Sequence, residues 1–389
     1  MSMFLAVALL CFLTSQGGSV GPSQKETTAP RRETVSPKWR VDLRASIGGP
    51  ELPIVWGRKK EYKGRPKTSL WFTDNDTVVA TFVTSKAKVN PKLSSRDTSD
   101  ESLPLRLRAA FLNTATGSIS ATPEWPSQSR SAGIVAVHNG RFVTQTGNDV
   151  TLYGPDLRAL KNLALPSSEK GDWRADPSPT GKTILFLPHA LRTVNGITTD
   201  PWLWVETDTL KVLHSGEVTQ NGEVAISDEN MVRITCEWIY DCGPKIEMRG
   251  PSTEWKTIAR ASRHEYPRFI NQGMMFLSGD SPRLLRVDGE VLLTQGEPSG
   301  RAFAAADGHR FVVPSCQMEG KIATLDISGH CVLKAVLVYD ISPTRQSYTL
   351  EIKGPRIKGE MVFAISPDGT EFAVLNNEVI QVFQLPPLQ

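Results

Sequence analysis

Short alternating runs of apolar and polar residues dominate the chain, and a polar turn interrupts them at intervals of 35 to 64 residues. The clearest copy of this turn reads Ser-Pro-Asp-Gly-Thr at 366–370, and the apolar run Phe-Ala-Val-Leu follows at 372–375. Alternation over about 4 to 8 residues is typical of half-buried β-strands. No segment shows a sustained apolar stripe with the helical period of about 3.6 residues. The pattern therefore predicts short antiparallel strands joined by tight turns, with almost no helix.

The polar turn occurs seven times, each time between two apolar strands. Its copies lie at 73–77, 138–141, 178–182, 227–230, 271–273, 306–309 and 366–370. A second hairpin of alternating strands follows six of them, at 107–121, 150–166, 202–216, 245–259, 283–295 and 335–352. A repeat of about 40 to 50 residues made of four short strands indicates one blade of a β-propeller. We therefore predict an all-β fold, a seven-bladed β-propeller of four-stranded antiparallel blades, with strands A to D running from the central channel outward.

The last repeat is incomplete, because only one strand follows its first hairpin. The segment 38–46 alternates cleanly and precedes the first repeat. Propellers commonly close when one terminus supplies the missing outer strand to the blade formed by the other, which removes an open sheet edge. We expect 38–46 to be this closing strand, beside 378–385, so that a single propeller domain covers 38–387.

The N-terminal region has the features of an export signal. An apolar run at 4–14 is followed by small residues, which indicates a signal peptide over 1–21, although no Lys or Arg precedes the run. The run is shorter than the roughly 18 apolar residues that a membrane span requires. We expect the polar, Pro-rich segment 22–37 to be a disordered linker. The protein is thus expected to be exported, periplasmic or extracellular, without a transmembrane span in the mature chain; an uncleaved anchor or a misassigned start is the alternative.

Four cysteines follow the expected signal peptide, and an even number in an exported chain favours disulfides. Cys236 and Cys242 flank one B-to-C connection, and Cys316 and Cys331 flank another. Neighbouring antiparallel strands have Cα atoms about 4.5 to 5.5 Å apart, within the range that a disulfide spans. We expect Cys236 to pair with Cys242, and Cys316 with Cys331. The alternatives are free thiols in the core or a four-cysteine metal site, for which the C-x-x-C spacing is missing.

Charge and composition exclude some classes of function. The 44 basic and 41 acidic residues leave a formal net charge of +3. This balance argues against a nucleic-acid partner, which calls for a basic surface. The six histidines are scattered singly, and no H-E-x-x-H motif occurs. We therefore expect neither a metal nor a cofactor.

Charged and aromatic residues gather where the A strands begin, at the mouth of the expected channel. The position seven residues before the turn glycine is Arg174 in the third repeat, Glu223 in the fourth and Arg301 in the sixth. Tyr266 and Arg268 lie near this position in the fifth repeat, and Trp173 lies beside Arg174. Three guanidinium groups and two aromatic rings at one place could bind a carboxylate or a phosphate, since guanidinium binds both in a bidentate manner. The alternative is that the arginines pair with Asp176, Glu223 or Glu360. The site is then a structural charge cluster.

The lengths of the B-to-C connections differ between blades. Three are short, at 146–149, 279–282 and 375–378, and four are long, at 85–104, 188–200, 236–244 and 316–332. All B-to-C connections lie on one face of a propeller, here called the top face. Long loops on a rigid scaffold are the usual place of binding. The alternative is that insertions accumulate there because they do no harm.

The turns at 366–370 and 178–182, each between two apolar strands, resemble those of YVTN-type and WD-repeat propellers, especially exported bacterial ones. The resemblance covers about 38–387 and lies in the repeat. The Trp-Asp dipeptide of true WD repeats is absent, so the resemblance implies a fold and no site residues.

Our leading interpretation is an exported, monomeric, non-enzymatic propeller that binds a protein, peptide or glycan on its top face. A hydrolase or lyase with its site at the channel mouth is one alternative. A structural part of an envelope complex is another.

Overall fold

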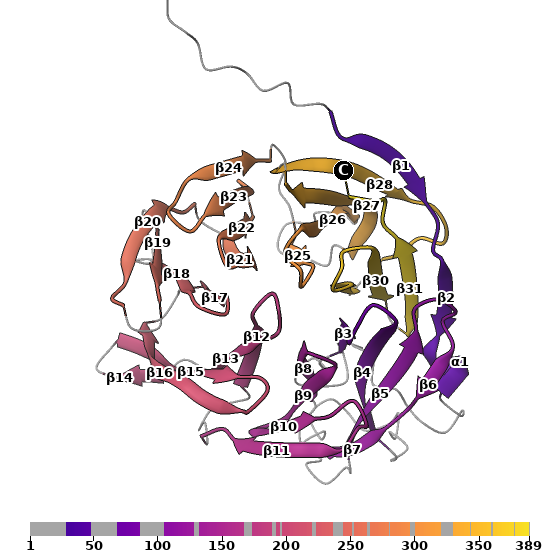
Figure 1. Ribbon diagram of the computed structural model, residues 1–389, viewed down its shortest axis with the longest axis horizontal. Helices are drawn as coiled ribbons and strands as arrows, with labels where there is room; N and C mark the ends of the chain where they lie inside the picture. The colour runs from indigo at the N-terminus through magenta and orange to yellow at the C-terminus, as the bar shows by residue number, and fades with distance from the viewer. Residues whose placement is uncertain are drawn as a thin grey trace, which may run out of the picture.

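The computed structural model describes residues 29–47, 68–85, 105–127, 132–166, 173–188, 192–194, 197–219, 223–235, 244–250, 253–262, 265–279, 281–295, 300–319, 330–342, 344–358, 361–376 and 378–388. Seven β-sheets stand around a central channel, and the chain passes round the ring once (Figure 1). The signal peptide expected over 1–21 lies outside the described residues. No helix in the described part of the chain is long and apolar enough to span a bilayer.

The first three blades follow the predicted order of strands. Blade 1 contains β3 (Ser69–Phe72), β4 (Thr77–Ser85), β5 (Leu105–Asn113) and an outer strand split into β6 (Ile119–Ala121) and β7 (Glu124–Ser127). Blade 2 contains β8 (Gly133–His138), β9 (Arg141–Thr146), β10 (Asp149–Tyr153) and β11 (Ala159–Ala164). Blade 3 contains β12 (Trp173–Pro177), β13 (Thr183–Pro188), β15 (Ile197–Glu206) and β16 (Lys211–Thr219), with β14 (Arg192–Val194) paired to the start of β15.

Blades 4 to 7 complete the ring. Blade 4 contains β17 (Glu223–Ile226), β18 (Met231–Thr235), β19 (Lys245–Arg249) and β20 (Lys256–Arg260). Blade 5 contains β21 (Tyr266–Asn271), β22 (Met274–Ser278), β23 (Arg283–Arg286) and β24 (Val291–Thr294). Blade 6 contains β25 (Phe303–Ala304), β26 (Arg310–Glu319), β27 (His330–Ile341), β28 (Thr344–Ile352) and β1 (Arg31–Val35). Blade 7 contains β29 (Met361–Ile365), β30 (Glu371–Asn376), β31 (Val379–Gln384) and β2 (Trp39–Asp42).

The predicted closing strand is confirmed, but it is shorter than expected. Strand β2 pairs antiparallel with β31, with Trp39 opposite Val382. The chain then turns into helix α1 (Leu43–Ile47), so the expectation of a strand up to residue 46 is wrong. The physical reason is an N-cap: the carboxylate of Asp42 accepts a hydrogen bond from the Ala45 amide. Leu43 is fully buried in the core shared by blades 7 and 1.

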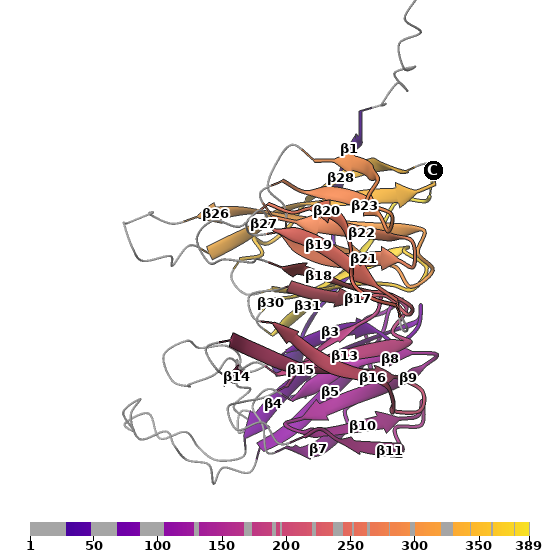
Figure 2. The ribbon, with the colours of Figure 1, turned by 90° about the vertical axis from the view of Figure 1, so that its left-hand side faces the viewer.

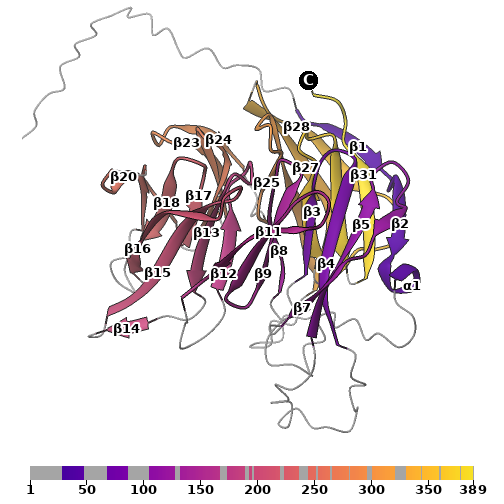
Figure 3. The same ribbon diagram turned by 60° about the horizontal axis from the view of Figure 1, so that its bottom comes forward.

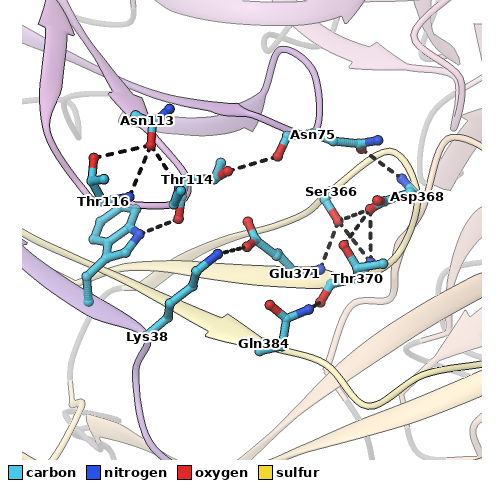
Figure 4. Close-up of polar contacts among 12 residues, drawn as sticks. Lys38, Asn75, Asn113, Thr114, Thr116, Ser366, Asp368, Thr370, Glu371 and Gln384 are labelled. Carbon is cyan, nitrogen blue, oxygen red and sulfur yellow. Dashed lines mark hydrogen bonds and ion pairs between the residues drawn. The ribbon is translucent and has the colours of Figure 1, made fainter.

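The closing strand also joins blade 7 to blade 1 (Figure 4). The Trp39 indole nitrogen donates to the Thr114 carbonyl oxygen at 2.6 Å, and the Lys38 ammonium group contacts the buried Glu371 carboxylate at 2.6 Å. Thr114 in turn donates its hydroxyl to the Asn75 carbonyl oxygen. The Trp39–Thr114 hydrogen bond thus connects the outer strand of blade 7 to a turn of blade 1, the Lys38–Glu371 contact lies within blade 7, and the Thr114–Asn75 bond lies within blade 1.

Strand β1 is a second departure from the sequence-based expectation. Residues 22–37 were expected to be disordered, yet Arg31–Val35 pairs parallel with β28 and adds a fifth strand to blade 6. Only Val35 of this strand is half-buried. The free edge of β28 supplies backbone partners for this strand, and such pairing does not require alternating apolar side chains in Arg31–Val35.

Hydrogen bonds between neighbouring A-to-B turns encircle the bottom face, opposite the top face. Among the described residues, such bonds join adjacent blades at six of the seven junctions. The pairs are His138–Thr180, Thr180–Asp228, Asp228–Gln272, Asn271–Gly308, Asp307–Pro367 and Asp368–Asn75. The recurring turn seen in the sequence therefore has a second role. Besides reversing the chain, it connects neighbouring blades at these six junctions.

Apolar side chains fill the space between adjacent blades. The Phe142 and Tyr153 rings stack at 5.2 Å in blade 2, beside Trp125 of blade 1. The Phe311 and Tyr339 rings stack at 4.6 Å in blade 6, beside Phe276 of blade 5. Burial of the Tyr339 hydroxyl raises the pKa of this phenol. The core is thus a series of interfaces between sheets, as expected for a propeller.

Candidate functional site

The central channel contains a cavity of about 710 Å³. Its walls come from A strands and A-to-B turns. Blades 6, 7, 1 and 2 contribute a largely apolar wall, which includes Phe303, Phe363, Leu70 and Val135. Blades 3, 5 and 6 contribute the charged side chains of Asp176, Arg268 and Arg301. A concave, mostly apolar space with a few convergent polar groups is the usual form of a ligand site.

Three arginines from different blades converge on the carboxylate of Asp176. Arg174 lies two residues before it on β12, and its Nε is 2.8 Å from Oδ2. The Nη2 atoms of Arg268 on β21 and Arg301 before β25 are 3.3 and 3.2 Å from Oδ1. The ion pairs thus cross the channel from blade 3 to blades 5 and 6. Asp176 is nearly buried, at 7% exposure, so the guanidinium groups compensate for its lost hydration.

Arg301 is the most exposed member of this cluster. Its side chain is 51% exposed because it borders the channel, although blades surround it. Desolvation by the surrounding protein lowers the pKa of its guanidinium, the Asp176 charge opposes this, and the Arg174 charge lowers the pKa further. Glu223 at the start of β17 acts in the same direction as Asp176. An arginine remains protonated in such a setting, so Arg301 is a permanent cation in the channel.

The structure brings together four of the six residues predicted for the channel mouth. Arg174, Arg268 and Arg301 meet at Asp176, and Glu223 is close enough to influence Arg301. Trp173 does not take part. It is 3% exposed in the core between blades 2 and 3, and its indole nitrogen donates to the Pro166 carbonyl oxygen at 3.0 Å. Alternation along β12 explains this, since neighbours on a strand point to opposite faces.

Tyr266 has a different environment from Arg268, although both belong to β21. Its side chain is an exposed large apolar group, at 47% exposure, outside the residues that line the cavity. Asp176, in contrast, is the centre of the cluster, yet the sequence indicated it only as an alternative partner of the arginines. Its position two residues after Arg174 on the same strand was the signal, because such residues share a face.

The pairing with Asp176 bears on the chemistry of the channel. The sequence left two possibilities open. The arginines could be neutralised by neighbouring carboxylates, or they could converge unpaired on an empty pocket. The structure shows both features, since Asp176 neutralises part of the charge while Arg268 and Arg301 still line the cavity. Within the described ranges, no group of three or more His, Cys, Asp or Glu side chains is arranged to hold a metal ion.

The top face is marked by long C strands in three blades (Figures 2 and 3). Strands β5, β15 and β27 have 9, 10 and 12 residues, whereas β10, β19, β23 and β31 have 5, 5, 4 and 6. In blade 6 the pairing of β26 with β27 continues to Glu319 and His330, beyond the end of β28. The hairpin therefore projects from the sheet on this face.

Two of the long connections contain more β-structure than expected. The segment 316–332 was predicted to be a loop, but β26 continues to Glu319 and β27 begins at His330. The segment 188–200 contains the small hairpin of β14 with β15. The backbone N–H and C=O groups of the two strands of such a hairpin form hydrogen bonds with each other, so strand pairing extends into the insertion. The greater part of 85–104 and of 236–244 lies outside the described residues.

One described cysteine, Cys316, forms a disulfide bond. Cys316 lies within β26, two register positions from Cys331 on β27, and Cys316 is disulfide-bonded. Cys316 thus belongs to strand B, and Cys331 lies within strand C, because β27 already begins at His330. The side chain of Cys331, and Cys236 and Cys242 altogether, are outside the described residues, so both predicted pairings remain predictions.

We expect peptide mapping of the non-reduced protein to yield one peptide pair that joins Cys316 to Cys331 and another that joins Cys236 to Cys242. Treatment with a reductant before digestion should separate both pairs, and this is the control. A peptide that links residues of blades 4 and 6, or a free thiol at Cys236 or Cys242, would contradict the predicted pairing. Mass spectrometry distinguishes these outcomes.

Comparisons with known proteins show the fold and no family. No family model matches the chain, and no curated protein is similar to it in sequence. A chain in the crystal structure of a mitotic checkpoint complex is 10% identical with a TM-score of 0.50, over 98% of this chain and 100% of that one. The uncomplexed acylaminoacyl peptidase of Pyrococcus horikoshii is 10% identical with a TM-score of 0.51, over 85% of this chain and 54% of the peptidase. This chain therefore spans about half of the peptidase, and the likeness shows a propeller fold alone.

Proposed function

We propose that this protein is an exported, monomeric, non-enzymatic propeller of the YVTN-like kind, and that its top face binds a protein, peptide or glycan partner. The observation that carries this proposal is the unequal length of the C strands. The C strands of blades 1, 3 and 6 are long, and the blade 6 hairpin continues beyond β28 on the top face, while the C strands of the other blades are short. A rigid sheet that supports a projecting hairpin is a favourable base for a binding surface.

Export is supported by the chemistry of Cys316. Disulfides persist in oxidising compartments and are rare in the cytosol, and Cys316 is disulfide-bonded. The apolar run at 4–14 is the matching feature of the sequence. The two observations are independent, since one concerns the thiol of Cys316 in blade 6 and the other a segment that precedes the propeller.

A binding role also agrees better with the channel than hydrolysis does. Nucleophilic catalysis requires a nucleophile within hydrogen-bond reach of a base. The cations of the channel cluster are arginines that already contact a carboxylate. Guanidinium groups bind anions and do not act as nucleophiles or bases at neutral pH. The channel cluster therefore favours ligand binding.

The test is to shorten the blade 6 hairpin in the full chain. Replacing 320–329 with Asn-Gly keeps the paired strands β26 and β27 and supplies a two-residue hairpin turn. We expect partners captured from the envelope fraction to bind about tenfold or more weakly, a loss of at least about 1.4 kcal/mol. Quantitative pull-down followed by mass spectrometry measures the effect for each captured partner.

A matched control changes the outer circumference instead of the top face. Leu160 on β11 and Val291 on β24 are exposed, at 53% and 51%, and both can be replaced with Ser. This control should bind every partner as the wild-type protein does. Equal capture by the shortened hairpin and the wild type would count against the top face. Both variants must first show an unchanged far-UV spectrum and melting temperature.

A further inference from the structure

We propose that the channel is a separate binding site for a ligand that joins a carboxylate to an apolar body, and that Arg268 and Arg301 bind the carboxylate. This site goes beyond the proposed top-face function and does not depend on it. Three independent features support the proposal: the charge of the cluster, the donors left on the two arginines, and the apolar residues that line the same cavity.

The cluster has more positive than negative charge. Arg174, Arg268 and Arg301 contribute three cations, and Asp176 and Glu223 contribute two anions, which leaves one positive charge. The excess lies inside a channel, where the surrounding protein reduces solvation and strengthens attraction to an anion. A monoanion would neutralise the cluster. A dianion would bring an additional negative charge close to Asp176.

The two arginines at the cavity retain unused donors. Each contacts Asp176 Oδ1 through its Nη2 atom, and within the described chain neither guanidinium has another bonded acceptor. A guanidinium has five N–H donors in a rigid plane that matches a carboxylate. Asp176 thus acts as a positioning residue, because it holds both side chains in place before a ligand arrives. Such preorganisation reduces the entropy that binding costs.

Other residues of the same cavity offer apolar contacts. Phe303, Phe363, Ile365 and Trp71 line the cavity and are only half-buried, so each leaves apolar surface uncovered. The Phe303 and Phe363 rings pack together with centroids 5.6 Å apart, which makes the cavity wall aromatic at the junction of blades 6 and 7. An apolar body of a ligand would bury this surface while its carboxylate reaches the arginines. The cavity, at about 710 Å³, is large enough for a drug-sized molecule.

Two sources could supply this chemistry, a fatty acid or the C-terminal end of a peptide. Isothermal titration of the full protein with decanoate and with N-acetyl-Leu-Phe tests each source. The matched neutral probes are methyl decanoate and the C-terminal amide of the same peptide. We expect at least one carboxylate to bind, with its neutral counterpart about tenfold to a hundredfold weaker, as expected for hydrogen bonds to a charged group.

Variants then locate the site. Arg301→Ala should weaken the carboxylate by about tenfold to a hundredfold and leave the fold intact, because Asp176 keeps Arg174 and Arg268. Arg286→Ala, in an exposed ion pair of blade 5, should bind as the wild type does. Arg301→Lys keeps the charge without the bidentate fork and should bind with intermediate affinity.

The binding results distinguish support for the carboxylate site from its refutation. Binding of decanoate alone identifies an acyl chain as the ligand, and binding of the peptide alone identifies a peptide end; either supports the proposal. No binding of either carboxylate, equal binding of acid and neutral probe, or wild-type affinity in Arg301→Ala would overturn it. Tight binding of inorganic phosphate without either carboxylate would also overturn it, because phosphate needs no apolar wall. The variant with 320–329 replaced should keep carboxylate binding, so failure of the top-face function is distinguishable.

Discussion

Replacing Arg310 with Ala is expected to lower the free energy of unfolding by about 3 to 5 kcal/mol. Arg310 and Asp340 are both 1% exposed in blade 6, and the Arg310 Nε donates to Asp340 Oδ1 at 2.7 Å. The Arg310 Nη1 also donates to the carbonyl oxygens of Gly369 and Pro386, at 3.2 and 2.6 Å. The variant would leave a buried carboxylate without its cation and would release the C-terminal segment from blade 6.

Urea denaturation monitored by tryptophan fluorescence measures this loss. The control is Arg286→Ala, whose ion pair with Glu290 is exposed at 47% and 55%; it should change stability by less than about 1 kcal/mol. The double variant Arg310→Met with Asp340→Leu removes both charges and should be more stable than Arg310→Ala. If Arg310→Ala proves as stable as Arg286→Ala, the ion pair does not have the structural role assigned to it.

Replacing Gly181 with Ala is expected to destabilise the protein by about 2 to 5 kcal/mol. Gly181 follows Pro-Thr in the turn of blade 3 and has a φ of +73°, which an L-residue adopts at a cost. A Cβ atom there would lie 1.8 Å from the Val137 carbonyl oxygen of blade 2. Because this neighbour is backbone, it cannot rotate away, and the junction between blades 2 and 3 would have to open.

Gly140→Ala is the matched control. Gly140 occupies the same position in the turn of blade 2, with a φ of +70°, but its added Cβ would meet nothing closer than the Pro155 side chain at 3.7 Å. This variant should lose only the conformational cost, about 1 to 2 kcal/mol. The difference between the two urea midpoints measures the contact between blades. Equal losses in both variants would show that the close approach of the two blades contributes nothing to stability.

The repeat was readable from the sequence because its signals are local. A period-2 alternation reports which face of a strand is buried, and a turn such as 178–182 reports where the chain reverses. Seven copies of that pattern predicted seven blades, and the missing strand of blade 7 predicted closure by β2. The sequence also predicted the three arginines of the channel mouth, because residues at the start of each strand A lie at the same end of the channel.

Other features depended on partners distant in the sequence. Strand β1 has no apolar alternation, and only the free edge of β28, more than three hundred residues away, makes Arg31–Val35 a strand. Trp173 and Arg174 are neighbours in sequence, yet the sheet places one in the core and the other in the channel. The choice of Asp176 as the common partner of Arg268 and Arg301 likewise depends on the approach of three blades.

The sequence by itself thus determined the number of blades, the order of the strands and the closure of the ring. The tertiary structure decided which charges meet, where the apolar wall lies and how far strands such as β27 extend. The physical reason is the range of the interactions. Alternation and turn formation involve residues within one hairpin, whereas the ion pairs at Asp176 and the cavity beside Phe303 and Phe363 exist only after separate blades have assembled around the channel.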